Sequence, residues 1–290
     1  MILVRSLAFV LLTFTSATAF AQVTEDSTGL PGDNFSLQGA LELFKRASSV
    51  EEFEKLLNTE SSNVNNLDLN DDGRIDYIKV IDRADRNVHA FILQVPVTET
   101  ENQDIAVIGL ERTGDATAQL QIVGDEDIFG EEVIVEPDDG DGTAKFTPVD
   151  GMWYEHGPAA SDINDNSEAV IVNVWVWPVV RYVYAPFYTA WVSPWRWAYR
   201  PVWWSPWRPV SWAVWRPRHA GFAPHYVVVR EHRVIRARQV YRPVRSASVV
   251  VHTRYSAPVG HYRATRTTTT IEGKHGRKVK VTKTKVRRRR

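Results

Sequence analysis

Oxygen-bearing side chains recur at alternate positions in the stretch DLNDDGRID, which covers residues 68–76. They fall at positions 1, 3, 5 and 9 of the stretch, and Gly73 lies at position 6. Calcium takes six to eight oxygen ligands, and glycine permits the sharp turn that brings alternate residues together. The predicted calcium ligands are Asp68, Asn70, Asp72, Asp76 and, through its backbone carbonyl, Arg74.

The stretch departs from a regular EF-hand, because Lys79 stands at position 12 in place of a bidentate glutamate. It resembles the DxNxDGxxD calcium loops of dockerin-like and integrin-type repeat proteins. The resemblance covers only these nine residues, and it implies that Asp76 binds the ion directly. We expect a structural ion that links a helix to a sheet, with a dissociation constant of about 10⁻⁴–10⁻³ M. The alternative is an Asp/Asn/Gly-rich turn that binds no ion.

A second group of residues suggests adhesion. Ten of the eleven tryptophans lie between Trp175 and Trp215, where SPWR occurs twice, at 193–196 and 205–208. Repeated prolines exclude a continuous helix or a central strand here. The residues predicted to contact a polyanion or a membrane are Trp195, Arg196, Trp203, Trp204, Trp207, Arg208, Trp215 and Arg216.

Three uses of these tryptophans and arginines are open. The aromatic rings could pack on one another with guanidinium groups stacked across them. They could lie at a membrane interface, where Trp and Tyr prefer the headgroup region and Arg attracts anionic lipid. They could also stack on sugar rings while Arg holds phosphate or carboxylate groups.

The charge is divided between two halves. Residues 1–170 contain 33 acidic and 10 basic side chains, whereas residues 171–290 contain 2 acidic and 25 basic ones. This division predicts an acidic folded module and a basic adhesive one. The basic half could instead lie against the acidic half of its own molecule, or link one molecule to the next.

The elements that would position these residues follow from periodicity. Ser36 and Ser49 precede helical apolar patterns, and strands are expected at 75–81, 88–97, 105–110, 119–123 and 133–135. The expected fold class is α+β: two N-terminal helices and a small antiparallel sheet. An irregular Trp/Pro/Arg-rich segment and a basic β-hairpin (strands 262–271 and 277–286) or a disordered tail would follow.

The predicted organisation has six parts. These are a signal peptide at 1–21, a linker at 22–34, the acidic domain at 35–136, a linker at 137–168, the Trp/Pro/Arg-rich segment at 169–224 and the basic tail at 225–290. The signal peptide predicts export to the periplasm or the cell surface, including association with the outer membrane. The sequence has no cysteine, which excludes disulfides and a lipoprotein anchor, and no later apolar run is long enough to span a bilayer.

Residues typical of catalysis are not arranged in a known motif, so we expect no enzymatic activity. His89 is interpreted as a packed or surface residue, and the acidic cluster at 125–132 as a solvated loop. The alternating acceptors at 162–168 lack a turn glycine and are a weaker candidate for an ion site.

The whole chain resembles uncharacterised exported proteins of Gram-negative bacteria, especially Bacteroidota. These combine a signal peptide, an NLDLNxDGxxDYI-type stretch (here Asn66–Ile78) and a basic Trp/Pro/Arg-rich tail. The leading hypothesis is a non-enzymatic envelope protein that adheres to anionic polymers, glycans or lipid headgroups; export argues against nucleic acid. The alternatives are a self-assembling structural protein and a glycan-active enzyme.

Overall fold

The computed structural model describes residues 27–138, 171–272 and 278–284 of the chain; for residues 264–272 and 278–284 only the backbone is described. The predicted signal peptide, the linker from residue 139 onward and the acceptors at 162–168 therefore lie outside the described residues.

The described chain combines helices with a six-stranded antiparallel sheet of order β1-β2-β3-β4-β5-β6 and a separate two-stranded sheet, β7-β8. The strands are β1 (Lys79–Asp85), β2 (Val88–Pro96), β3 (Asn102–Gly114), β4 (Thr117–Gly124), β5 (Val133–Pro137), β6 (Tyr226–Val229), β7 (Arg266–Glu272) and β8 (Lys278–Thr284). The α-helices are α1 (Leu37–Arg46), α2 (Val50–Leu57), α3 (Glu126–Phe129), α4 (Pro178–Val183), α5 (Trp212–His219), α6 (Ile235–Tyr241) and α7 (Val249–Thr265). The 3₁₀ helices are η1 (Pro31–Asn34), η2 (Glu60–Ser62), η3 (Ala220–His225) and η4 (Arg242–Val244).

The first two helices begin at the serines that the sequence indicated. The Ser36 hydroxyl accepts a hydrogen bond from the Gly39 N–H at 3.0 Å, and the Ser49 hydroxyl accepts one from the Glu52 N–H at 3.1 Å. Each serine satisfies a donor that the helix itself cannot pair. The prediction of two N-terminal helices is thus confirmed.

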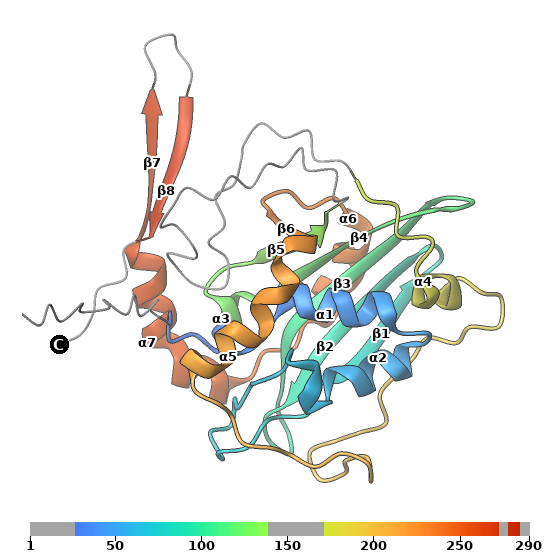
Figure 1. Cartoon of the computed structure of the whole chain (residues 1–290), viewed down its shortest axis with the longest axis horizontal. Helices are drawn as coiled ribbons and strands as arrows, with labels where there is room; N and C mark the ends of the chain where they lie inside the picture. Colours follow the sequence, from blue (N-terminus) through green and yellow to red (C-terminus); the bar gives the residue numbers. More distant parts are fainter. Residues whose placement is uncertain (1–26, 139–170, 273–277, 285–290) are drawn as a thin grey trace, which may run out of the picture.

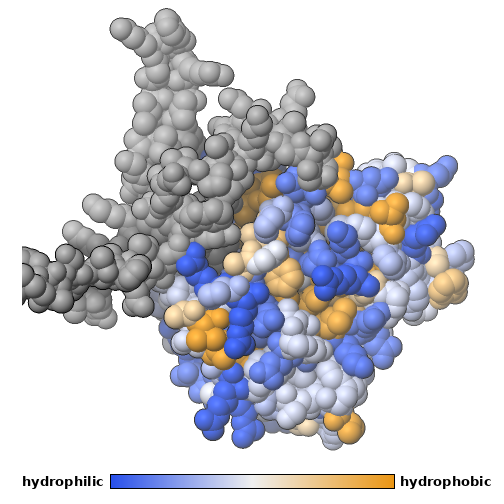
Figure 2. Space-filling view, in the orientation of Figure 1, coloured by the Kyte–Doolittle hydropathy of each residue, from blue (hydrophilic) through white to orange (hydrophobic). Residues whose placement is uncertain are grey.

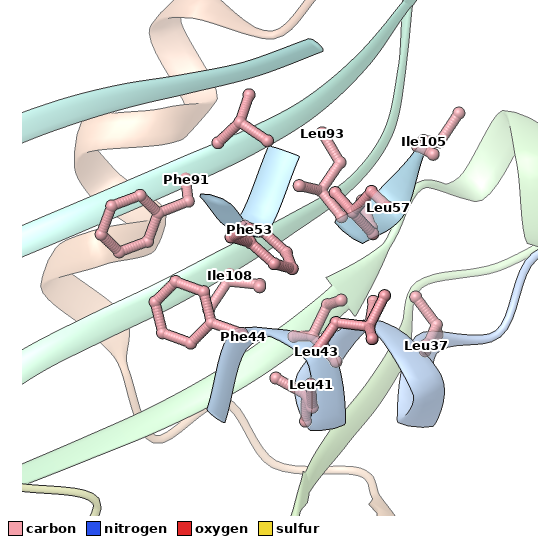
Figure 3. Close-up of a cluster of buried hydrophobic side chains, with 14 of the residues drawn as sticks. Leu37, Leu41, Leu43, Phe44, Phe53, Leu57, Phe91, Leu93, Ile105 and Ile108 are labelled. Carbon is pink, nitrogen blue, oxygen red and sulfur yellow. The ribbon is translucent and has the colours of Figure 1, made fainter. Parts of the chain in front are cut away.

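The main core lies between these helices and one face of the sheet. Aromatic and aliphatic side chains of α1 and α2, including Phe44 and Phe53, pack against Phe91 and Leu93 of β2 (Figure 3). The neighbouring residues of β2, Ala90 and Ile92, point to the opposite face and contact Tyr241 of α6. Because helices cover both faces, every residue of β2 is buried.

The first strand differs from its predicted position. Strand β1 begins at Lys79 and continues to Asp85, whereas the strand was expected at 75–81, so residues 75–78 precede it. The turn between β1 and β2 is formed by Arg86, in the left-handed conformation at φ 55°, and Asn87. The Ile78 N–H is already paired with the Asn58 side chain at 2.8 Å, so it is not available to the strand ladder.

Elements of the basic half, residues 171–290, complete the sheet and the core. Strand β6 pairs with β5, from Ile134↔Val229 to Pro137↔Tyr226. Apolar side chains of α4, including Val179 and Val183, belong to the main core (Figure 1 shows α4 beside α1). The sheet and core therefore cross the predicted boundary at 137–168.

Three further expectations are corrected by the structure. The Trp/Pro/Arg-rich segment, expected to be irregular, contains helices α4 and α5, and the basic tail contains helices α6 and α7 before its hairpin. The hairpin β7-β8 is present, but its first strand starts at Arg266 because α7 continues to Thr265.

In the described part of the chain, no helix is long and apolar enough to cross a membrane.

Candidate functional site

In the predicted calcium loop, side-chain oxygens accept hydrogen bonds from backbone N–H groups of the same loop. The Asp68 carboxylate accepts hydrogen bonds from the N–H groups of Asp72 (3.1 Å) and Gly73 (2.9 Å), and Asp72 accepts one from Arg74 (2.9 Å). Asn70 also accepts from the Asp72 N–H at 2.9 Å. Gly73 has φ 76°, a conformation that favours glycine. The alternating side chains thus converge on the loop interior.

Asp76 joins this loop to the core. Its carboxylate is 4 % exposed and accepts the Leu69 N–H at 2.6 Å. Burial raises the pKa of Asp76 to about 7, and the charges of Asp68 and Asp72 add to the effect. A divalent cation would offset this repulsion, and the oxygen donors are those that Ca²⁺ prefers. Among the described residues, however, no three His, Asp or Glu side chains form a group that could hold a metal ion on their own, so Asn70 and backbone carbonyls would have to contribute.

The aromatic–arginine loop, defined as residues 187–208, is anchored to the N-terminal half at both ends. At its start the Asp82 N–H donates to the Trp191 carbonyl at 2.7 Å, and the Ser193 N–H donates to the Val80 carbonyl at 3.1 Å. At its end the Ile75 N–H donates to the Trp207 carbonyl at 2.8 Å. The loop is irregular but fixed at its base.

Glu54 of α2 is the centre of the first anchor. Its buried carboxylate accepts four hydrogen bonds, from Tyr77 Oη (2.9 Å), Ser193 Oγ (2.9 Å), the Val80 N–H (2.9 Å) and Trp191 Nε1 (3.1 Å). Burial raises the pKa of Glu54, and these donors oppose the rise. One carboxylate thereby joins a helix, a strand and the loop.

His89 lies in a second anchor that the sequence did not reveal. Its Nδ1 is 2.9 Å from Asp82 Oδ2, which also accepts a hydrogen bond from the Tyr188 hydroxyl at 2.7 Å. The ring is buried, stacks on Phe91 and meets Tyr184 edge to face. These are the contacts of a packed residue that holds the loop.

No family model matches the chain, and no curated protein or solved structure matches it either. Any functional proposal therefore rests on the geometry of this chain alone.

The eight predicted contact residues divide into three groups. Trp215 is buried at 2 % exposure, and its indole donates to the Asp33 carbonyl at 3.0 Å, so its interpretation as a surface contact is wrong. The half-buried residues are Trp195, Trp204, Trp207 and Arg216, whereas the exposed ones are Arg196, Trp203 and Arg208.

Part of the aromatic–arginine loop packs on itself and on residues of the acidic half. Arg200 lies over the rings of Tyr77 and Trp204 at 5.7 and 5.8 Å, and Lys55 lies over Trp203 at 5.5 Å. Trp204 also meets Tyr77 edge to face. The stacking of cations on aromatic rings thus occurs within the molecule.

Other apolar side chains of the loop are turned outward. Val202 is 104 % exposed, Phe187 76 %, Tyr199 71 % and Val192 56 %. Figure 2 shows separate apolar spots among hydrophilic ones along the edge where α4 and the chain after it lie in Figure 1. The sequence has no Asp or Glu between residues 169 and 230, so the arginines of this loop have no acidic neighbours in sequence.

The acidic cluster at 125–132 is only partly solvated: Glu126 and Glu132 are exposed, but most of its charge is paired with arginines. Asp125 is buried and accepts two hydrogen bonds from Arg245, at 2.6 and 2.8 Å, while Asp127 accepts a third at 2.7 Å. Glu132 accepts hydrogen bonds from Arg238 at 2.8 and 2.9 Å. The acidic half therefore binds the basic half of the same molecule.

Proposed function

We propose that this protein is a non-enzymatic envelope protein that attaches to an anionic lipid surface through the aromatic–arginine loop. The observation that carries the proposal is the exposure of Phe187, Tyr199 and Val202 on a loop whose base is fixed to the core. Several large apolar side chains exposed on one loop are a candidate interaction site. A fixed base reduces the entropy lost on binding.

Lipid suits the exposed side chains better than sugar does. Two of the most exposed residues of the loop, Val202 and Val192, are aliphatic and have no ring to stack on a sugar. Aliphatic and aromatic side chains gain free energy on entering the headgroup boundary, at about 25 cal/mol per Å² of apolar area. The exposed Arg196 and Arg208 would add about 1 kcal/mol each near an anionic leaflet.

Replacing Tyr199 and Val202 together by Ser is expected to weaken vesicle binding at least tenfold, since it removes about 2 kcal/mol of apolar transfer energy. The measurement is cosedimentation of the full chain with vesicles of anionic or zwitterionic phospholipid. A matched variant, Val244→Ser with Val249→Ser, changes exposed residues outside the loop and should bind like the parent.

Equal binding to both kinds of vesicle, or equal loss in both double variants, would contradict the lipid proposal. Retention on an anionic glycan without vesicle binding would point to the sugar-stacking alternative instead.

We also propose that Ca²⁺ occupies the loop at residues 68–76 and stabilises the fold. Asp68, Asn70, Asp72, Asp76 and the Arg74 carbonyl would hold the ion. The loop lies next to the aromatic–arginine loop, because the residue after Arg74 pairs with Trp207. An ion here would therefore stiffen the base of the proposed binding surface.

Adding 10 mM Ca²⁺ to the full chain is expected to raise its stability by about 1.4–2.7 kcal/mol, if the dissociation constant is about 10⁻⁴–10⁻³ M. Thermal unfolding with and without a chelator measures the change. Asp72→Ala should abolish the gain, whereas Asp85→Ala, an exposed carboxylate outside the loop, should retain it. An unchanged melting temperature at 10 mM Ca²⁺ would leave the loop as a turn stabilised by its own side chains.

The charge-driven self-assembly alternative has less support from the geometry. Asp125, Asp127 and Glu132 already pair with arginines of their own chain. Fewer charges of either sign are then left to join neighbouring molecules.

A further inference from the structure

The second face of the sheet is only partly covered. Helix α6 packs over β2 and β3, with Ala237 and Tyr241 facing the sheet. Beside it, a cavity of about 300 Å³ remains over β3 and β4. Val107 and Val123 form an apolar floor, and Val123 is only partly buried. This volume is at the lower end of the range for small-molecule sites.

Three arginines line the cavity: Arg238 of α6, Arg242 of η4, and Arg245, which directly follows η4. Arg245 is held by Asp125 and Asp127, as described above. Arg242 is 60 % exposed, and its contact with Glu132 is long, at 3.5 Å. A guanidinium carries five N–H donors, so this contact leaves most of the donor capacity of Arg242 available to another acceptor.

Glu132 faces more positive charge than one carboxylate can balance. It accepts from Arg238, contacts Arg242 and lies 3.1 Å from His232 Nε2. Burial alone would raise the pKa of Glu132, but the hydrogen bonds from Arg238 and His232 lower it below its usual value. Glu132 therefore stays ionised and occupies part of a site that favours carboxylates.

We infer that this cavity binds a small organic anion with an apolar body, of the class of short-chain carboxylates. The apolar body would lie on Val107 and Val123, and the carboxylate would bind Arg242 and the remaining donors of Arg238. An inorganic anion would leave the apolar floor unused. A cation would have to displace arginines from the carboxylates that also line the cavity, those of Asp125, Glu126 and Glu132. The site is built from α6, β3 and β4, so it goes beyond the proposed lipid attachment through residues 187–208.

Hexanoate is a suitable probe, because it joins a carboxylate to a short apolar chain. Titration calorimetry of the full chain is expected to show saturable hexanoate binding, and at least tenfold weaker binding of acetate and of hexylammonium. Arg242→Gln should weaken hexanoate binding about tenfold, as expected when one hydrogen bond to a charged group is lost. Glu132→Gln should tighten it, because the competing carboxylate is removed.

Arg46→Gln is the matched control, since Arg46 is an exposed arginine of α1 that pairs with Glu42. It should bind hexanoate like the parent. Glu132 and Arg242 are both surface-accessible, so their variants should fold, and their circular dichroism should match that of the parent. Equal binding of hexanoate and hexylammonium, or unchanged affinity in both Arg242→Gln and Glu132→Gln, would overturn the inference, as would no hexanoate binding at millimolar concentration.

Discussion

Arg245→Met is expected to lower the free energy of unfolding by about 3 kcal/mol, because it leaves a buried carboxylate without its cation. Asp125 is 6 % exposed, and Arg245 supplies two of its hydrogen bonds. Burial raises the pKa of Asp125, and Arg245 opposes that rise. The loss corresponds to a fall in melting temperature of roughly 10 °C for a domain of this size, measured by urea and thermal denaturation.

A double-mutant cycle tests the cause. Asp125→Asn combined with Arg245→Met should recover part of the loss, since no unpaired charge remains. Arg46→Met removes an exposed pair with Glu42 and should cost no more than about 0.5 kcal/mol. If Arg245→Met costs as little as Arg46→Met, the ion pair does not hold the two halves together.

Glu54→Ala is expected to lower the free energy of unfolding by about 4 kcal/mol or more. The substitution leaves four buried or partly buried hydrogen-bond donors without an acceptor. An unsatisfied buried donor costs about 1–3 kcal/mol, and the carboxylate also leaves a cavity. Glu54→Gln should cost about half as much, since one side-chain oxygen still accepts while the amide group meets donors. Denaturant unfolding measures both changes.

Release of the loop is a second consequence of losing Glu54. The carboxylate holds Trp191 and Ser193 at the start of the aromatic–arginine loop, so tryptic cleavage after Arg196 should become faster in Glu54→Ala. Glu51→Ala, an exposed position on the same helix, should change neither stability nor cleavage. A stability loss with unchanged cleavage would mean that Glu54 supports the core but not the loop.

Patterns among residues close in sequence predicted the helices and strands of the N-terminal half well. The serine caps and the apolar stripes of α1 and α2 depend on residues a few positions apart, and alternation marked five of the strands. Strand β6 was missed because Tyr226–Val229 is only four residues long and takes its partner from the other half of the chain. A short apolar run gives no sign of which edge it will join.

The sequence allowed for pairing of the two charged halves within one molecule, but it did not indicate which residues would pair. Arg245 and Asp125 are 120 positions apart, and Trp191 is 137 positions from Glu54. Composition indicated that two oppositely charged halves exist, but only the fold selects which residues meet. Of the predicted contact residues, Trp215 was misplaced because a tryptophan repeat does not distinguish a buried indole from an exposed one.

The position of β6 at the end of the sheet also determines how the chain must fold. Synthesis runs from the N-terminus, so the open edge of β5 exists well before Tyr226 is made, and pairing them closes a long loop at an entropic cost. Until then β5 offers unpaired N–H and C=O groups to any neighbouring strand. Chains that end before Tyr226 would keep this edge permanently open. We therefore expect such truncated forms to aggregate, even though they contain all but two of the acidic residues that favour solubility.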